Sequence, residues 1–350
     1  MKTILITGGC GFIGSHFVRL VLRNPEYQVV NLDKLTYAGN LQNLIDVEGE
    51  KNYCFVKGDI ADETLVDRLF REERPGAVVN FAAESHVDRS ILDPSPFIQT
   101  NVIGVQVLLE AARRHGVERF VQVSTDEVYG DADAKEVFHE DSPLTPSSPY
   151  AATKAAADLF GLAYQRTYGL PVLITRSSNN YGPFQFPEKL IPLLIRNALG
   201  GEDLPVYGDG LQSRDWLHVE VNAEAIFQVL EKGQIGSIYN VGTGEERTNI
   251  ELVRAVCHLL AEEAGLDLKK LLSRIRMVAD RPGHDRRYAL NTRKIREDLG
   301  WSSQVPFETG LRGTVRWYLD HQAWVKQVTS GEYQAYYEAV YSQAWGRTST

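Results

Sequence analysis

A glycine-rich segment near the start of the chain constrains its fold more than any other feature. Residues 8–14 follow a short apolar run, residues 4–7, and lead into a helical pattern of apolar residues. Glycines allow the backbone angles of a tight turn and let the main chain approach a pyrophosphate at a helix N-terminus. The segment therefore predicts a strand, a phosphate-binding turn and a helix. The expected phosphate contacts are Gly8, Gly11, Phe12, Ile13 and Gly14.

Short apolar runs alternate with longer helical patterns along the first half of the chain. Such alternation favours right-handed βαβ crossovers, and strands that are apolar throughout favour a parallel sheet covered on both faces. The expected fold class is α/β, a doubly wound parallel sheet (Rossmann) with a smaller mixed α/β substrate domain. The strands are expected at residues 2–7, 28–32, 52–56, 77–81, 119–124 and 171–175.

The pattern changes after about Ser177 to loops rich in Asn, Pro and Gly mixed with helices. A chain of 350 residues is long enough for two domains. We therefore expect a dinucleotide-binding Rossmann domain over residues 1–177 and a substrate-binding domain over residues 178–350. The β-rich run at about residues 237–242 is expected to return to the main sheet, and residues 346–350 are expected to form a disordered tail.

Composition argues against several classes of partner. The net charge of -9 disfavours nucleic acid and anionic membrane surfaces, because both require clustered Lys and Arg. The 3 cysteines show neither a disulfide pattern nor zinc-ligand spacing, so no metal is expected and a reducing cytoplasm is the expected compartment. No apolar run is long enough to cross a bilayer.

An acidic residue, Asp33, closes the second predicted strand. Its carboxylate could accept hydrogen bonds from the adenosine ribose hydroxyls, and its charge would repel a 2′-phosphate, so NAD is preferred over NADP. The alternative is that Asp33 only ends a strand. Asp59 and Ile60 would flank the adenine, although Gly58-Asp59 is also an ordinary turn pair. The remaining expected cofactor contacts are Lys34, Phe81, Ala82 and Ala83.

A tyrosine and a lysine four residues apart, Tyr150 and Lys154, lie at the start of a predicted helix. On a helix the ammonium lies on the same face as the phenol, within roughly 6 Å. Together with the charge of oxidised nicotinamide, it would lower the phenol pKa from about 10 to near 7 and make Tyr150 a usable base. The same spacing at Tyr53 and Lys57 falls in a predicted strand, where the side chains are too far apart to couple.

Two adjacent acids follow the predicted strand that ends at Ser124. Thr125, Asp126 and Glu127 should emerge at the carboxyl edge of the sheet, beside the nicotinamide. Neighbouring acids can take opposite roles if their environments separate their pKa values, so that one stays protonated and the other ionised. The alternative is a turn with two solvated acids.

These motifs resemble the extended short-chain dehydrogenase/reductase family, and within it the sugar-nucleotide 4,6-dehydratases, which are NAD-dependent lyases. The resemblance covers nearly the whole chain. Its discriminating element is the Asp126-Glu127 pair, which epimerases of the same fold usually lack. The matching motifs are residues 8–14, 82–90, 125–130, 150–154 and 181–192.

The resemblance implies a reaction in which NAD accepts a hydride from C4 of dTDP-glucose and returns it to C6 after water is lost. Tyr150 would take the C4 hydroxyl proton, Glu127 would take the C5 proton, and Asp126 would protonate the departing C6 hydroxyl. Thr125 would hold the C4 oxygen, and Lys154 would bind the nicotinamide ribose.

The resemblance also implies a substrate pocket and two further cofactor contacts, Thr100 and Asn180. Arg214 and Arg281 could clamp a pyrophosphate by paired hydrogen bonds. His86 is expected near the substrate rather than at a metal, because no partners recur at ligand spacing. The implied substrate contacts are Ser85, His86, Thr125, Asn179, Glu188, Lys189, Arg214, Asn249, Arg281 and His284.

Some features depart from the family or leave alternatives open. Val221 and Asn222 replace an expected acidic and basic residue, which puts the start of that helix in doubt. A homodimer is implied by the family alone, through helices expected at residues 96–115 and 150–168. The residues do not decide the nucleotide. The alternatives are another nucleotide-sugar 4,6-dehydratase, a nucleotide-sugar 4-epimerase and a non-catalytic NAD-binding protein.

Overall fold

A computed structural model describes residues 2–329, and seven parallel strands of this part of the chain form one sheet. The order from edge to edge is β10-β6-β5-β4-β1-β2-β3, so the strand order reverses beside β1, as in doubly wound folds. The α/β prediction is confirmed, and the six predicted strands form to within two residues at each end. The strands are β1 (Lys2–Thr7), β2 (Tyr27–Asp33), β3 (Tyr53–Lys57), β4 (Ala77–Asn80), β5 (Arg119–Thr125), β6 (Val172–Ser177) and β10 (Ile238–Val241).

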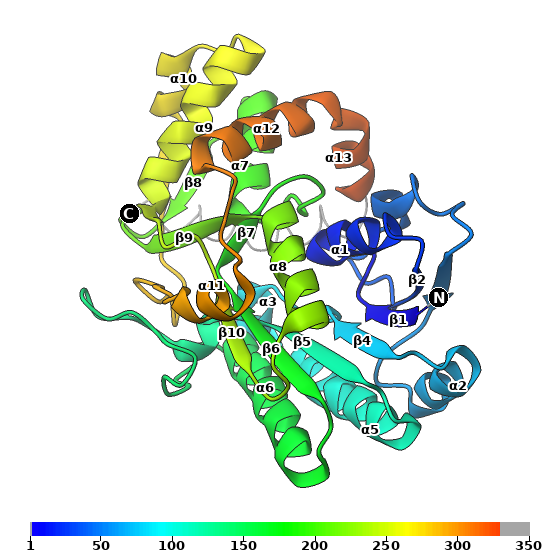
Figure 1. The fold of residues 1–350 in the computed structure, drawn as a ribbon. Coiled ribbons are helices and arrows are strands. Elements are labelled where there is room, and N and C mark those ends of the chain that lie inside the picture. The colour runs from blue at the N-terminus through cyan, green and yellow to red at the C-terminus, as the bar shows by residue number, and fades with distance from the viewer. Residues whose placement is uncertain (1, 330–350) are drawn as a thin grey trace.

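Helices cover both faces of the sheet, as Figure 1 shows. Helices α1 (Phe12–Leu22) and α8 (Val219–Lys232) pack on one face, where Phe17 and Ile226 belong to the same buried apolar cluster. The opposite face is covered by α2 (Glu63–Glu73), α5 (Val105–His115) and α6 (Pro149–Tyr168). Burying both faces explains why the strands are apolar along their whole length.

Helix α8 begins at Val219 even though Val221 and Asn222 depart from the family pattern. Both residues are buried, and the Asn222 side chain accepts a hydrogen bond from the Ser177 hydroxyl at 2.8 Å. The doubt about this helix start is therefore removed, because the two residues pack the helix against the end of β6.

The second half of the chain builds a smaller body with its own apolar core at one end of the sheet (Figure 1). Two small sheets, β11-β9-β7 and β12-β8, lie within it. Strand β10 lies in the main sheet, where Ile238 pairs with Ile174 of β6. The division into domains at residue 177 stays a prediction, and residues 330–350, including the expected tail, lie outside the described part. The elements are β7 (Asn179–Tyr181), α7 (Leu190–Gly200), β8 (Leu204–Tyr207), β9 (Ser213–His218), β11 (Glu246–Thr248), α9 (Asn249–Ala264), α10 (Leu268–Ser273), β12 (Ile275–Val278), α11 (Arg293–Leu299), α12 (Phe307–Asp320) and α13 (Gln322–Val328).

Five short helical segments complete the described chain, and two of them carry residues of interest below. Asn43 lies in η1, which follows β2, and the two adjacent acids lie in η3, which follows β5. None of the helices among residues 2–329 is long and apolar enough to span a membrane. The segments are η1 (Leu41–Leu44), α3 (Val87–Leu92), α4 (Ser95–Ile98), η2 (Gln99–Gly104) and η3 (Asp126–Tyr129).

A buried ion pair joins the helix and the turn that carry the predicted catalytic residues. Arg176 of β6 donates from Nε to Asp158 of α6 at 2.8 Å and from a terminal nitrogen to the Tyr129 hydroxyl of η3 at 2.8 Å. The Tyr129 hydroxyl donates in turn to Asn240 of β10 at 2.8 Å. A buried pair of this kind adds little net stability but strongly disfavours any arrangement that separates the charges. The network therefore holds α6, η3 and two strands in one register.

A buried histidine on α1 predicts loss of stability in acid. His16 is 6% exposed, its Nε2 lies 3.0 Å from the Pro183 carbonyl oxygen, and burial lowers its pKa from 6.5 to about 4. Because the folded pKa is the lower one, the unfolded chain binds more protons between these values, so stability falls as the pH drops from about 6.5 toward 4. We expect His16 to account for about 2 to 3 kcal/mol of the loss between pH 7 and about 4.5.

The measurement is urea unfolding of the parent and His16→Gln at both pH values. Glutamine offers a side-chain N–H for the same carbonyl but does not titrate, so the variant should lose less stability on acidification. An equal loss in both proteins would show that His16 does not cause it.

Candidate active site

The glycine turn is tight, and a side chain at Gly8 or Gly14 would clash with the neighbouring backbone. Gly8 has a φ of +70°, and a Cβ there would lie 2.6 Å from the Ala82 nitrogen. A Cβ on Gly14 would lie 2.3 Å from the Gly8 carbonyl oxygen. The first turn of α1, at Phe12 and Ile13, presents the amides that have no partner within a helix. This arrangement fits a pyrophosphate, because the backbone can approach it closely and the helix N-terminus attracts anions.

Asp33, the last residue of β2, is held by backbone amides. Its Oδ2 accepts from the Cys10 amide at 2.9 Å and its Oδ1 accepts from the Leu35 amide at 2.8 Å. Burial raises the pKa of the Asp33 carboxyl, and the two backbone hydrogen bonds oppose that rise. Each carboxylate oxygen can accept a further hydrogen bond, so Asp33 suits a pair of ribose hydroxyls.

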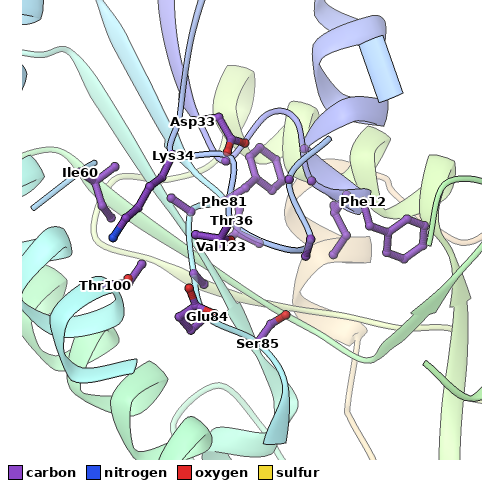
Figure 2. Close-up of a pocket in the computed structure, with 18 of the residues that line it drawn as sticks. Phe12, Asp33, Lys34, Thr36, Ile60, Phe81, Glu84, Ser85, Thr100 and Val123 are labelled. Atoms are coloured by element: carbon purple, nitrogen blue, oxygen red, sulfur yellow. The ribbon is translucent and has the colours of Figure 1, made fainter. Parts of the chain in front are cut away.

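One cavity runs from the glycine turn to the start of α6. Figure 2 shows Asp33, Lys34 and Ile60 on one side of it and Glu84, Ser85 and Thr100 on another. Asn180 is not among its lining residues, and its amide nitrogen donates instead to the Ser178 carbonyl at 2.9 Å. All other predicted cofactor residues line the cavity: Gly8, Gly11, Phe12, Ile13, Gly14, Asp33, Lys34, Asp59, Ile60, Phe81, Ala82, Ala83, Thr100, Tyr150 and Lys154.

Several lining residues were not predicted from the sequence. A signal was available for those that follow predicted strands, since the carboxyl ends of parallel strands face the ligand. Thr36 and Gly39 follow β2, Glu84 follows β4, and Ser124 lies at the end of β5. No comparable signal marks Gln185 and Phe186, which reach the cavity from a loop of the second half of the chain.

Tyr150 and Lys154 lie in the first two turns of α6, which is capped by the Ser148 side chain. The Lys154 ammonium donates to the Val123 carbonyl of β5 at 2.6 Å. Burial lowers the pKa of Lys154 to about 8, while the nearby Asp158 carboxylate opposes this shift. The lysine is therefore fixed to the main sheet at the wall of the cavity.

The groups of the chain itself raise the Tyr150 pKa, and the expected lowering by Lys154 together with oxidised nicotinamide stays a prediction. Burial raises the pKa of Tyr150, and the charge of Glu127 raises it further, while a hydrogen bond with Thr125 lowers it. Both of the larger influences favour the neutral phenol, because burial disfavours any charge and a carboxylate repels a phenolate. The chain alone therefore keeps Tyr150 protonated.

Asp126 and Glu127 differ in their surroundings. Asp126 is 2% exposed, and burial raises its pKa, followed by the charge of Glu127. Burial also raises the pKa of Glu127, but Arg281, Arg214 and Lys189 lower it. Asp126 is thus suited to stay protonated, and Glu127 has three cations that favour its ionised form.

Thr125 links the two acids through its hydroxyl. The Thr125 oxygen accepts from the Glu127 amide at 3.3 Å, and the hydroxyl donates to Asp126 Oδ1 at 3.2 Å. Thr125 is the N-cap of η3, so this short helix begins where β5 ends. The pair of acids is held in a defined turn and is not a pair of solvated side chains.

A second cavity adjoins the first and contains most of the predicted substrate residues. Ser85, Glu188 and Lys189 line both cavities, so the two meet at these residues. Glu127 lines the second cavity, whereas Thr125 and Asp126 line neither. The predicted substrate residues in its wall are Ser85, His86, Asn179, Glu188, Lys189, Arg214, Asn249, Arg281 and His284.

Two guanidinium groups lie in the wall of the second cavity, which also carries carboxylates. Arg281 pairs with Asp88 at 3.2 Å, and Arg214 donates to the Asp285 carbonyl at 2.7 Å and stacks on Tyr288. Arg214 is held by carbonyl oxygens and an aromatic ring, which leave most of its charge for an anion. Two arginines in one cavity suit a diphosphate.

Part of the wall of the second cavity is apolar, and the sequence did not predict it. Leu190, Val206 and Val278 come from α7, β8 and β12, and Tyr207 donates from its hydroxyl to Asp88 at 3.0 Å. Strand β12 is far from α7 and β8 in the sequence and meets them through the β8-β12 pairing. The wall suits the flat face of a nucleobase. No group of three or more His, Cys, Asp or Glu side chains arranged to hold a metal occurs among residues 2–329.

Comparison with known proteins gives a consistent result. The chain matches the family model described as GDP-mannose 4,6 dehydratase over residues 5–314. It is 54% identical over 344 residues to dTDP-glucose 4,6-dehydratase of Xanthomonas campestris pv. campestris (strain B100), covering 95% of this chain and 98% of that protein.

Two solved structures are similar in fold as well as in sequence. The dTDP-glucose 4,6-dehydratase of Bacillus anthracis str. Ames, in complex with NAD, has a TM-score of 0.86 and 47% identity, covering 94% of this chain and 100% of that one. DesIV, the dTDP-glucose 4,6-dehydratase of Streptomyces venezuelae with NAD and TYD bound, has a TM-score of 0.88 and 50% identity, covering 93% of this chain and 100% of that one.

Proposed function

The chain belongs to the GDP-mannose 4,6 dehydratase family, and on this basis we propose that it converts dTDP-glucose to dTDP-4-keto-6-deoxyglucose and water. The cofactor is NAD, which supplies a hydride acceptor and, later in the same turnover, the donor of that hydride. The glycine turn, the backbone-held Asp33 and the small residues Ala82 and Ala83 fit this cofactor.

Three side chains move the protons of the proposed reaction. The positive charge of bound oxidised nicotinamide, added to that of Lys154, would favour the phenolate form of Tyr150, which then takes the proton of the C4 hydroxyl. Thr125 hydrogen-bonds the oxygen that becomes the ketone. The ketone makes the C5 proton acidic, and Glu127 removes it. Asp126, kept protonated by burial and by the charge of Glu127, donates its proton to the departing C6 hydroxyl.

The observation that best supports this proposal is that the predicted catalytic residues lie where the two cavities meet. Tyr150 and Lys154 line the cofactor cavity, Glu127 lines the substrate cavity, and both cavities share Ser85 and Lys189. The charge of Glu127 acts on Tyr150, and Asp126 is the neighbour of Glu127 in η3, which supports a role for the phenol and both acids at one sugar ring. Arg214 and Arg281 are assigned to the diphosphate.

The proposal is tested by incubating the purified protein with dTDP-glucose and following the sugar nucleotide by mass spectrometry. We expect a product lighter by one water, without net formation of reduced cofactor. UDP-, CDP- and GDP-glucose at equal concentration should react more slowly, which tests the nucleotide. An epimer of unchanged mass, or accumulation of reduced cofactor, would point to the epimerase or dehydrogenase alternative.

A homodimer is also part of the proposed function, and exposed apolar residues support it. Leu159 of α6 is 56% exposed, and Ile98 and Ile103 are exposed on the neighbouring α4 and η2. Apolar side chains gathered on adjacent helices favour a self-complementary interface with twofold symmetry.

Replacing Leu159 by Glu should dissociate the dimer, because each copy would bury an unpaired carboxylate. Met277→Glu on β12 is the control, since Met277 is similarly exposed but lies away from α6. Light scattering after size exclusion should report a dimer for the parent and the control and a monomer for Leu159→Glu. A monomeric parent would refute the dimer.

A further inference from the structure

We propose that Trp324, on the last helix of the described chain, and Asn43 are positioning residues that hold the glycine turn in the form that retains NAD. Both residues lie outside the cavities, and neither belongs to the motifs that indicate the cofactor site. The inference rests on the proposed function only in taking NAD as the bound cofactor.

The backbone amide and the backbone carbonyl of Cys10, in the glycine turn, both form hydrogen bonds. The Cys10 amide donates to Asp33 Oδ2 at 2.9 Å. The Cys10 carbonyl oxygen accepts from the Asn43 side-chain nitrogen at 2.8 Å and from the Asn40 amide at 3.0 Å. The turn is therefore tied to the ribose-binding acid on one side and to η1 on the other.

The direction of the Cys10 carbonyl matters for an anion. Gly8 and Gly11 line the cofactor cavity, whereas Cys10 does not. The bond to Asn43 keeps the negative end of this carbonyl dipole on the side of η1. Turned toward the start of α1, the same carbonyl would repel a pyrophosphate and offset the attraction of the helix N-terminus.

Trp324 determines which way the Asn43 amide faces. Asn43 is 1% exposed, and its Oδ1 accepts from the Trp324 indole nitrogen at 2.9 Å. An indole N–H can only donate, so it requires the amide oxygen on its side and leaves the amide nitrogen facing Cys10. The opposite orientation of the amide would set two oxygens against each other at Cys10 and two N–H groups at Trp324.

Trp324 is itself held in an aromatic cluster. Its ring meets Trp317 of α12 at a centroid distance of 5.2 Å and Phe184 at 5.9 Å. Phe184 has a φ of +64°, a conformation that costs energy for a residue with a bulky side chain, so the cluster compensates for strain at this point. In Figure 1, α13 lies at the end of α12, on the side of the molecule where α1 and β2 lie.

The same cluster anchors a loop that lines both cavities. Phe184 precedes Gln185, Glu188 and Lys189, which form part of the cavity walls. The glycine turn and this loop are therefore held by one group of side chains at the C-terminal end of the described chain. A reaction that returns its hydride within each turnover benefits from slow release of the cofactor. The hydrogen bonds from Trp324 to Asn43 and from Asn43 to Cys10 slow this release by holding the glycine turn.

The test compares three single variants of the purified protein with NAD bound. Trp324→Phe keeps an aromatic ring but removes the N–H donor. Asn43→Asp keeps the acceptor for Trp324 but places a second oxygen against the Cys10 carbonyl. Trp301→Phe is the matched control, because Trp301 is also buried and its indole nitrogen has no hydrogen-bond partner among residues 2–329.

The measurement is the rate of NAD release, followed by native mass spectrometry after dilution into isotopically labelled NAD. We expect release to be about three- to tenfold faster in Trp324→Phe, the usual effect of losing one buried hydrogen bond, and at least tenfold faster in Asn43→Asp. Trp301→Phe should release NAD at the parent rate. Binding of dTDP, measured by calorimetry, should stay unchanged in all three.

Two results would overturn the inference. One is equal release from Trp324→Phe and Trp301→Phe. The other is a parallel loss of NAD and dTDP binding with a lowered Tm, because that pattern indicates general loss of structure. If Asn43→Asp does not fold, the comparison of NAD release between Trp324→Phe and Trp301→Phe is sufficient to test the inference. Release is measured without turnover, so failure of the proposed dehydration is detected separately.

Discussion

Glu127→Gln should stop dehydration while oxidation at C4 continues. Glutamine has the size of glutamate but cannot take the C5 proton, and a positioned base contributes about 100- to 10,000-fold to such a step. The charge of Glu127 also raises the Tyr150 pKa, so its removal favours loss of the phenol proton and does not impair the first step. We expect product formation to fall by at least about 100-fold, with reduced cofactor and the 4-keto sugar accumulating.

The absorbance of the reduced nicotinamide and the mass of the sugar nucleotide measure the two steps separately. Glu118→Gln is the matched control, because Glu118 is an exposed carboxylate outside both cavities. It should behave as the parent does. Dehydration at the parent rate in Glu127→Gln would mean that another group removes the C5 proton.

Tyr150→Phe should block the reaction before any hydride leaves the sugar. The variant keeps the ring that packs edge-on against Phe97 but has no group to take the C4 hydroxyl proton. We expect the rate of C4 oxidation to fall by about 100- to 10,000-fold, so that neither product nor reduced cofactor appears. This pattern differs from that of Glu127→Gln, in which reduced cofactor accumulates.

Tyr168→Phe, at the exposed end of the same helix, serves as the control for this substitution. Calorimetry with dTDP should show unchanged binding in both variants, because neither hydroxyl contacts the diphosphate arginines. Reduced cofactor forming at the parent rate in Tyr150→Phe would remove Tyr150 from the role of base.

The cofactor half of the site was predictable because its signals are local. The tight turn requires glycine at Gly8 and Gly14, and Asp33 ends a short, mostly apolar run that favours a buried strand. Lys154 shares a helix with Tyr150, so four residues of spacing place both at one cavity. Asn180 was placed by family resemblance alone, and its side chain donates to the Ser178 carbonyl oxygen instead of lining the cofactor cavity.

Other properties of the site depend on packing that no local pattern reports. The sequence shows that Asp126 and Glu127 are adjacent, but not that one is buried behind the cavity wall and the other faces three cations. The sequence also does not show that burial and Glu127 raise the Tyr150 pKa, which Lys154 and the nicotinamide charge have to offset. The path from Trp324 to Asn43 joins residues separated by 281 positions. Such a contact is visible only once the chain is folded.

The most direct test of the account is the fate of the hydrogen at C4. dTDP-glucose labelled with deuterium at C4 is converted by the purified protein in ordinary water, and the product is examined by NMR. If the hydride is removed and returned within one turnover, the deuterium appears in the C6 methyl group, and C5 carries hydrogen from the solvent. Deuterium that remains at C4, or that is lost to the solvent or to free reduced cofactor, would contradict the account.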